Sequence, residues 1–217
     1  MTRQPGWRAV VLSLGSNLGD RMAYLQLGVD VLAAGSLRSL AVSGVFETAP
    51  VGGPEQDDYL NAVLLGISAA PAREIMRLAT AAEEAASRER SERWGPRTLD
   101  VDVISCDDEI SVDPELTLPH PRAHERAFVL VPWLEVDADA VLPGRGTVAD
   151  LLAEIGTAGV HRRGDLSLTL PAGAGVRVEA GTGAEAGAGA EAGAGAEAGA
   201  GADAGAGAEA EAGLPCT

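Results

Sequence analysis

A ten-residue stretch from Arg93 to Asp102 (RWGPRTLDVD) brings together the side chains of this chain that could do chemistry. Residues 100–104 (DVDVI) alternate in polarity as a β-strand does, so Asp100 and Asp102 should point to one face of a sheet. Two neighbouring carboxylates repel each other, and a divalent cation between them removes that repulsion. Paired aspartates suit Mg²⁺, which keeps several waters and also binds substrate phosphates. The stretch therefore predicts a magnesium site.

Arginines surround this pair of carboxylates. Guanidinium groups stay charged, and their planar geometry matches phosphate oxygens. The chain has no lysine, which excludes a Walker-A lysine, a Schiff base and a lysine general base. We therefore expect phosphoryl-type transfer, with phosphate held by arginine, histidine, backbone amides or metal. The alternatives are an ordinary Asp-x-Asp on a surface strand, and a solvated helix end at 88–93 whose arginines pair with Glu89 and Glu92.

The bulk composition narrows the class of protein. A net charge of −16 over 217 residues argues against a general binder of nucleic acid or anionic membranes. Cys106 and Cys216 are too few and too far apart for a disulfide framework or a zinc site. The first six residues lack the apolar segment of a signal peptide, and no apolar run reaches transmembrane length. We expect a soluble cytoplasmic protein with reduced cysteines.

Hydrophobic periodicity predicts the order of the elements. The first part should form strand, helix, strand, strand, helix and strand, over residues 7–14, 22–35, 40–48, 59–67, 71–85 and 100–104. Asp20 should cap the first helix. A short extended piece at 110–112, a stiff loop at 118–121 and helices at 126–134 and 147–155 should follow, with Thr147 as a cap. This order is typical of a ferredoxin-like α+β domain, an antiparallel sheet with helices packed on it.

The composition changes beyond about Pro171. Residues after Gly173 repeat alanine, glycine and an acid with a period of six. Such a segment buries too little apolar area to offset the entropy of ordering it, and its glycines disfavour a helix. We expect a domain over residues 1–170 and a disordered acidic tail over 171–217 without a catalytic role. A solenoid or silk-like assembly is the alternative for the tail.

Four blocks of sequence resemble one known family. They are 14–21 (LGSNLGDR), 47–52 (ETAPVG) with 58–62 (DYLNA), 93–102, and 118–122 (LPHPR) with 125–128 (ERAF). In this order they resemble the 6-hydroxymethyl-7,8-dihydropterin pyrophosphokinases over roughly residues 8–155. Ala49 and Glu47 differ from the proline and arginine of some members, and the tail lies outside the resemblance.

The resemblance implies a function and its partners. It implies a ferredoxin-like enzyme that transfers pyrophosphate from ATP to the hydroxymethyl group of a reduced pterin and releases AMP, in folate biosynthesis. It implies two Mg²⁺ ions, ATP and a reduced pterin as ligands. We expect a monomer, and the net charge of −16 argues against nucleic-acid or membrane partners. A non-catalytic pterin- or nucleotide-binding module of the same fold is one alternative. A fused folate enzyme that lacks its partner domain is the other.

The resemblance also implies site residues. Catalytic roles would belong to Arg88, Arg90, Asp100 and Asp102, and both aspartates would bind the metal. ATP contacts would come from Glu83, Arg90, Arg93, Val103, His120 and Arg126. Pterin contacts would come from Thr48, Ala49, Val51, Tyr59, Asn61, Trp94 and Phe128. Two aromatic faces suit a flat ring, and a buried amide suits its polar edge. Arg97 would hold phosphate or brace the aspartates, whereas Asn61 could instead cap a loop and Trp94 could belong to the core.

Overall fold

The computed structural model describes residues 5–50, 54, 56–86 and 97–174. Within these residues the main sheet has the strand order β10-β3-β4-β1-β5, with β2 also paired to β4, and every pairing is antiparallel. The main strands are β1 (Arg8–Ser16), β2 (Arg38–Val42), β3 (Phe46–Thr48), β4 (Tyr59–Ser68), β5 (Asp100–Cys106) and β10 (Val160–Arg162). The predicted ferredoxin-like α+β fold is confirmed.

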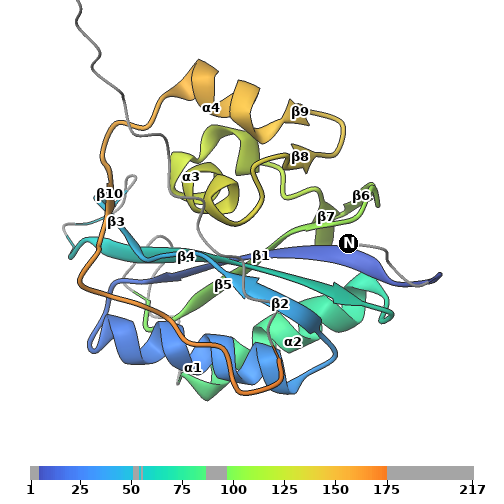
Figure 1. The fold of residues 1–217 in the computed structure, drawn as a ribbon, viewed down its shortest axis with the longest axis horizontal. Helices are drawn as coiled ribbons and strands as arrows, with labels where there is room; N and C mark the ends of the chain where they lie inside the picture. Colours follow the sequence, from blue (N-terminus) through green and yellow to red (C-terminus); the bar gives the residue numbers. More distant parts are fainter. Residues whose placement is uncertain (1–4, 51–53, 55, 87–96, 175–217) are drawn as a thin grey trace, which may run out of the picture. The chain divides into compact units, whose positions relative to one another are not determined.

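Helices cover both faces of this sheet (Figure 1). Two lie on one face: α1 (Arg21–Ala34) and α2 (Ala72–Ala85). Two lie on the other: α3 (Ala127–Val136) and α4 (Val148–Ile155). The remaining elements are two small hairpins and a 3₁₀ turn: β6 (Ser111–Asp113), β7 (Leu116–Leu118), η1 (Ala123–Glu125), β8 (Val141–Leu142) and β9 (Gly146–Thr147).

The two helices of the first face begin where the sequence predicts. The Asp20 carboxylate accepts a hydrogen bond from the amide of Ala23 at 3.0 Å and caps α1, which ends before Gly35. Pro71 precedes α2, where its missing N–H costs no helical hydrogen bond. Each helix turns its buried face to the sheet, with residues at helical spacing: Leu25, Val29 and Leu32 of α1, and Ile75, Ala79 and Ala82 of α2.

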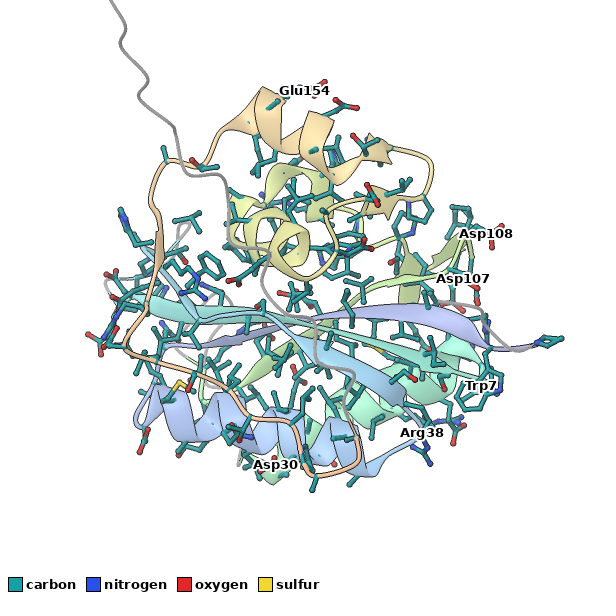
Figure 2. All side chains as sticks on the ribbon, in the orientation of Figure 1. Trp7, Asp30, Arg38, Asp107, Asp108 and Glu154 are labelled. Atoms are coloured by element: carbon teal, nitrogen blue, oxygen red, sulfur yellow. The ribbon has the colours of Figure 1, made fainter. Side chains whose placement is uncertain are left out.

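Strand alternation divides the core into two clusters, one on each face of the sheet. Leu12 and Val103 belong to the cluster under α1 and α2, whereas Val11 and Ile104 belong to the cluster under α3 and α4. Figure 2 shows side chains filling both layers, while Asp30 of α1 and Glu154 of α4 lie on the outer faces. Within the described residues, none of the helices has the length and apolar character needed to cross a bilayer.

The structure corrects the predicted strand over residues 40–48. It consists of two strands, β2 and β3, because Ser43 interrupts the regular pairing. Its backbone N–H donates to the carbonyl of Val63 at 2.9 Å, and its hydroxyl accepts from the amide of Val63 at 2.9 Å. The Glu135 carboxylate of α3 accepts from the next amide, Gly44, at 2.7 Å. The break therefore depends on neighbours that the local pattern does not contain.

A segment that the sequence leaves without structure, residues 160–174, packs against the sheet and α1. It begins with β10, which pairs with β3, and continues as residues 163–174, which we call the C-terminal strap. Thr169 and Gln26 of α1 exchange hydrogen bonds of 2.8 and 3.0 Å. Three alternate leucines of the strap pack against the α1–α2 cluster: Leu166, Leu168 and Leu170. The Ala174 carbonyl accepts from the amide of Leu40 at 3.0 Å. The predicted tail beyond residue 174 lies outside the described residues.

Candidate functional site

Both aspartates of β5 point to the α3 face of the sheet and form ion pairs with arginines. They lie on the same side of the strand as Ile104, as the alternation predicts. Asp100 is 2.5 Å from Arg97 Nη1, and Asp102 is 3.0 Å from Arg126 Nη1. Burial lowers the pKa of Arg97, but the charge and hydrogen bond of Asp100 offset this, and the net shift is upward. Arg97 therefore braces an aspartate.

Glycine lies between the aspartates and the amide that the sequence singles out. Gly15 of β1 is paired in register with Asn61 on one side and with Asp100 on the other. Since strands lie about 4.8 Å apart, Asn61 and Asp100 flank a strip about 10 Å wide. A Cβ atom at Gly15 would lie 3.4 Å from Asn61 Oδ1 and 3.7 Å from Tyr59 Cδ1. Because glycine has no side chain, Gly15 leaves open space on the sheet between Asn61 and Asp100.

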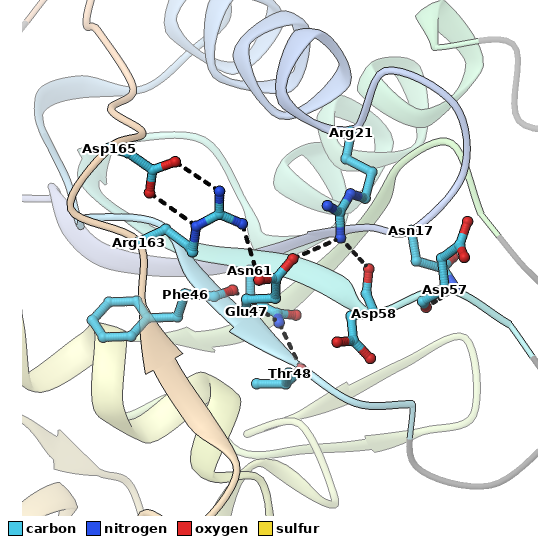
Figure 3. Close-up of polar contacts among 10 residues, drawn as sticks. All are labelled: Asn17, Arg21, Phe46, Glu47, Thr48, Asp57, Asp58, Asn61, Arg163 and Asp165. Atoms are coloured by element: carbon cyan, nitrogen blue, oxygen red, sulfur yellow. Dashed lines mark hydrogen bonds and ion pairs between the residues drawn. The ribbon is translucent and has the colours of Figure 1, made fainter.

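Asn61 is held from within the sheet. It is 3% exposed, and its Nδ2 donates to Thr48 Oγ1 at 2.9 Å and to the Phe46 carbonyl at 3.4 Å (Figure 3). Tyr59 is half-buried two residues away, and burial raises the pKa of its phenol. Ala49 follows Thr48 and is exposed. The structure thus brings together the predicted pterin residues of β3 and β4 where β3 ends and β4 begins.

A loop and the start of α3 add a second wall beside Asp102. His120 Nε2 is 3.8 Å from Asp102 Oδ2 and 3.4 Å from Arg126 Nη1. The His120 amide donates to the carbonyl of Ile104 at 2.8 Å, which fixes the loop to β5. Burial lowers the pKa of His120, Asp102 opposes this shift, and Arg126 adds to it. The Arg126 guanidinium also lies 5.5 Å from the centroid of the Phe128 ring, a cation–π distance.

Two predicted ATP contacts lie on the other side of β5. Glu83 of α2 is 6% exposed, and its Oε1 accepts from the amide of Val101 at 3.0 Å. Val103 is 6% exposed, and its side chain belongs to the α1–α2 cluster. Val103 can therefore present only its backbone to the aspartate face. The nucleotide roles of both residues stay predictions.

The donor set of β5 fits a hard cation that shares its ligands with substrate. Within the described ranges, no group of three or more His, Cys, Asp or Glu side chains is arranged to hold a metal ion. Asp100 and Asp102 offer carboxylate oxygens on one face, and their ion pairs with arginine both involve Oδ2. Mg²⁺ is commonly bound by one or two carboxylates, with waters and phosphate oxygens as its other ligands. The two aspartates fit that pattern.

Comparison with known proteins identifies the family. The family model of 7,8-dihydro-6-hydroxymethylpterin-pyrophosphokinase (HPPK) matches residues 11–138. The chain belongs to the HPPK family. A 2-amino-4-hydroxy-6-hydroxymethyldihydropteridine pyrophosphokinase of Mycobacterium leprae (strain TN) is 50% identical over 160 residues, which cover 67% of this chain and 82% of that relative. A relative of the same name from Methylorubrum extorquens is 39% identical over 152 residues, covering 70% and 96%.

A solved structure shows the same fold at low identity. A crystal structure of Plasmodium falciparum HPPK-DHPS with pteroate superposes with a TM-score of 0.52 at 12% identity, covering 71% of this chain. The chain spans 43% of that longer protein. This likeness supports the fold alone, while the family rests on the relatives of higher identity.

Several predicted HPPK residues lie outside the described residues: Val51, Arg88, Arg90, Arg93 and Trp94. Their predicted roles stay predictions. The described part adds Asn17, a residue that sequence reasoning did not single out. It is 1% exposed, and its Oδ1 accepts from the amide of Arg97 at 2.8 Å. Its Nδ2 donates to Gln56 Oε1 at 2.9 Å. Asn17 thus links the loop before α1 to the entry of β5, and its position in the block 14–21 is the signal that could have found it.

Proposed function

We propose that this chain transfers the pyrophosphoryl group of ATP to the hydroxymethyl group of 6-hydroxymethyl-7,8-dihydropterin and releases AMP, a step of folate biosynthesis. The observation that supports this most directly is the register of Asn61, Gly15 and Asp100 across three adjacent strands. It places an amide suited to a heterocycle and a carboxylate suited to Mg²⁺ on either side of Gly15. The names of the related pyrophosphokinases agree with this chemistry.

The pterin would lie over Gly15 with its polar edge toward Asn61. Because Thr48 holds the Asn61 amide group in place, the partner of the ring is fixed before binding. Phe128 would cover one face of the ring by stacking. We assign the rest of the pterin pocket to four residues: Ala49, Val51, Tyr59 and Trp94.

The triphosphate would lie beside β5. Asp100 and Asp102 would hold Mg²⁺, two ions in our proposal, which supplies charge neutralisation when bound. Arg126 and His120 lie next to Asp102 and would contact ATP. We assign further ATP or phosphate contacts to five residues: Glu83, Arg88, Arg90, Arg93 and Val103.

The reaction would be an in-line displacement at the β-phosphorus. The hydroxymethyl oxygen forms a new bond to this phosphorus and gives up its proton to solvent, the bond to the α–β bridging oxygen breaks, and AMP leaves. Such a transfer depends mainly on positioning and on stabilisation of charge. In this scheme the residues around Asn61 hold the pterin, and the residues around Asp102 hold the triphosphate in line with it. No side chain is assigned as a general base.

We propose further that the protein acts as a cytoplasmic monomer without nucleic-acid or membrane partners. Its net charge of −16 agrees with the absence of polyanionic partners. Of the tail predicted over residues 171–217, we propose that the part outside the described residues, 175–217, is disordered and has no part in catalysis.

An assay of AMP formation tests the proposed function. The purified chain is incubated with ATP and Mg²⁺, with and without 6-hydroxymethyl-7,8-dihydropterin, and the products are separated by chromatography. We expect AMP and the pterin diphosphate in equal amounts, only when the pterin is present, and their loss on chelation of Mg²⁺. Pterin binding without AMP would favour the non-catalytic binding module instead.

A further inference from the structure

One carboxylate on β3 joins two arginines from distant parts of the chain. Arg21 Nη1 at the start of α1 lies 3.0 Å from Glu47 Oε1, and Arg163 Nη1 at the start of the strap lies 2.9 Å from Glu47 Oε2 (Figure 3). Arg163 also pairs with Asp165 at 2.7 Å. We call Arg21, Glu47 and Arg163 the β3 clamp. The family match ends at residue 138, so Arg163 lies beyond it.

The β3 clamp connects segments that lead into the proposed pterin pocket. Arg21 Nη1 donates to the carbonyl of Asp58 at 2.6 Å, and the next residue is Tyr59. Glu47 immediately precedes Thr48 in the chain. Successive side chains of a strand point to opposite faces, so Glu47 grips β3 from the side away from Thr48. The β3 clamp therefore acts on the backbone of the pocket, without a direct contact to the ligand.

Thr48 links the position of β3 to the orientation of the Asn61 side-chain amide. Its hydroxyl is the 2.9 Å partner of Asn61 Nδ2. Only three residues make up β3, so few ladder hydrogen bonds fix its position. Its partners are β4 and β10, and β10 brings Val160 opposite Thr48. A shift of β3 would move Thr48 and leave Asn61 free to rotate.

A backbone hydrogen bond fixes the position of Arg163 relative to Glu47. The Arg163 amide donates to the carbonyl of Val45 at 2.8 Å, just before β3. The side chains of Arg163 and Glu47 are 30% and 25% exposed, so water reaches both. A polar hollow of about 640 Å³ opens next to Glu47 and is lined by Gly19, Arg21, Glu47, Gln56, Asp57 and Asp58. Exposed ion pairs contribute little to stability, so we expect the contact to matter for position more than for folding.

We propose that Arg163 is a positioning residue for the pterin site, and that it acts through Glu47 on β3, Thr48 and Asn61. This inference rests on the proposed function, because it assumes that Asn61 contacts the pterin. It gives the segment after β10 a role in substrate binding that the sequence pattern does not indicate.

A double-mutant cycle tests the link between the two residues. The variants are Arg163→Gln, Glu47→Gln and the double substitution, with Arg163→Lys as the conservative variant. For Arg163→Gln we expect a KM for pterin raised about fivefold, the effect of losing one well-placed charged contact, with kcat and the KM for ATP within about twofold of wild type. The double variant should be no worse than the poorer single variant, because both remove the same contact. Arg163→Lys should restore part of the affinity.

Asp165→Asn is the matched control, because it removes the other partner of Arg163 and leaves the Glu47 contact in place. Its KM for pterin should equal that of wild type. The inference is overturned if Arg163→Gln leaves this KM unchanged, if it raises the KM for ATP equally, or if Asp165→Asn has the same effect.

Direct pterin binding, measured by fluorescence titration on the same variants, separates this inference from the proposed function. Absence of AMP from a wild-type protein that binds pterin would refute only the proposed function. The Kd values of the variants for pterin would then still decide the inference. We expect Arg163→Gln to bind more weakly than wild type, Arg163→Lys to lie between them, and Asp165→Asn to equal wild type. A wild-type protein that binds no pterin overturns both.

Discussion

Asp102 combines three features that the proposed chemistry needs, an orientation and two charged or polar neighbours. It points to the α3 face of the sheet, it pairs with Arg126 at 3.0 Å, and His120 lies 3.8 Å away. Asp102→Asn keeps the shape and an oxygen for Arg126 but removes the charge that Mg²⁺ requires. We expect kcat for AMP formation to fall by about 10²-fold or more, as on removal of other groups that stabilise transition-state charge.

Asp113→Asn provides the control for Asp102→Asn. Asp113 lies in β6 and forms its ion pair with Arg73, so this change removes one carboxylate charge outside the site. Its turnover should match that of wild type. A folded Asp102→Asn protein with near-normal turnover would refute the metal role, and thermal unfolding of both variants establishes that they are folded.

The sequence predicts the face of the two aspartates but not their partners. Strand alternation alone places Asp100 and Asp102 on one side. Arg97 lies only three residues before Asp100, whereas the pairing of Arg126 with Asp102 depends on how the start of α3 packs against the sheet, which no local pattern contains. The sequence left two roles open for Arg97, and the structure shows that it braces Asp100. Gly15 makes room for the neighbouring side chain of Asn61, and only the pairing of β1 with β4 shows this.

Cys106 gives a prediction about stability at high pH. Its thiol is 1% exposed, and burial raises its pKa from 9.0 to about 11, with a further contribution from Glu109. Because the folded state holds the thiol proton more tightly than the unfolded state, the stabilisation is complete below pH 9 and is lost as the pH rises through 11. At about 1.4 kcal/mol per pKa unit, the loss by pH 11 should be about 2 kcal/mol.

Cys106→Ala should abolish this part of the pH dependence. Urea unfolding at pH 8, 9, 10 and 11 measures the free energy of unfolding of both proteins. The variant starts from a lower value because it leaves a small cavity, but its decline with pH should be shallower than that of wild type. Parallel curves for the two proteins would contradict the assignment to Cys106.

At the scale of elements, Glu83 joins α2 to the strand of the two aspartates. Its Oε1 accepts from the amide of Val101, the residue between Asp100 and Asp102. Glu83→Ala would leave this buried amide without its acceptor, so we expect unfolding to become easier by about 1–3 kcal/mol. Glu83→Gln keeps an acceptor oxygen and should lose less than half of that.

Kinetics on Glu83→Gln address the predicted nucleotide contact separately. A raised KM for ATP in a protein of near-normal stability would support that contact. An unchanged KM for ATP would show that Glu83 serves only the strand. Equal stability of the alanine variant and wild type would contradict the structural role of the Val101 hydrogen bond.

The helices followed from the sequence, including the short helix α4 with its Thr147 cap, and so did the short strand β6. The division into β2 and β3 and the strand β10 did not. The spacing of apolar residues predicts α1 and α2 because each makes several turns against the sheet. The division into β2 and β3 depends on Ser43 meeting Val63, which lies far along the chain. The strand β10 has three residues, two of them exposed, so it shows no alternation that a pattern could detect.

At the scale of the described fold, the residues of the proposed site and the strap that supports β3 lie on opposite faces of one sheet. The aspartates and Asn61 face α3, while the strap packs its leucines against the cluster of α1 and α2. The strands β2, β3 and β10 connect the strap to the proposed pterin pocket. The strap follows β10, β10 pairs with β3, and both β2 and β3 pair with β4. The extension after the family match is therefore part of the packed fold up to Ala174.

Two truncated chains test which part of the C-terminal segment contributes to stability and activity. A chain that stops at Ala174 keeps the strap, and we expect its kcat, its KM values and its free energy of unfolding to equal those of the full chain, since the acidic tail is assigned no part in folding or catalysis. A chain that stops at Arg162 loses the three packed leucines and the hydrogen bonds between Thr169 and Gln26. Each leucine contributes up to about 2 kcal/mol when buried, so urea unfolding should show a loss of at least about 2 kcal/mol. Loss of activity or stability in the longer truncated chain would instead give the tail a function, and equal stability of both truncated chains would mean that the strap contributes nothing to the fold.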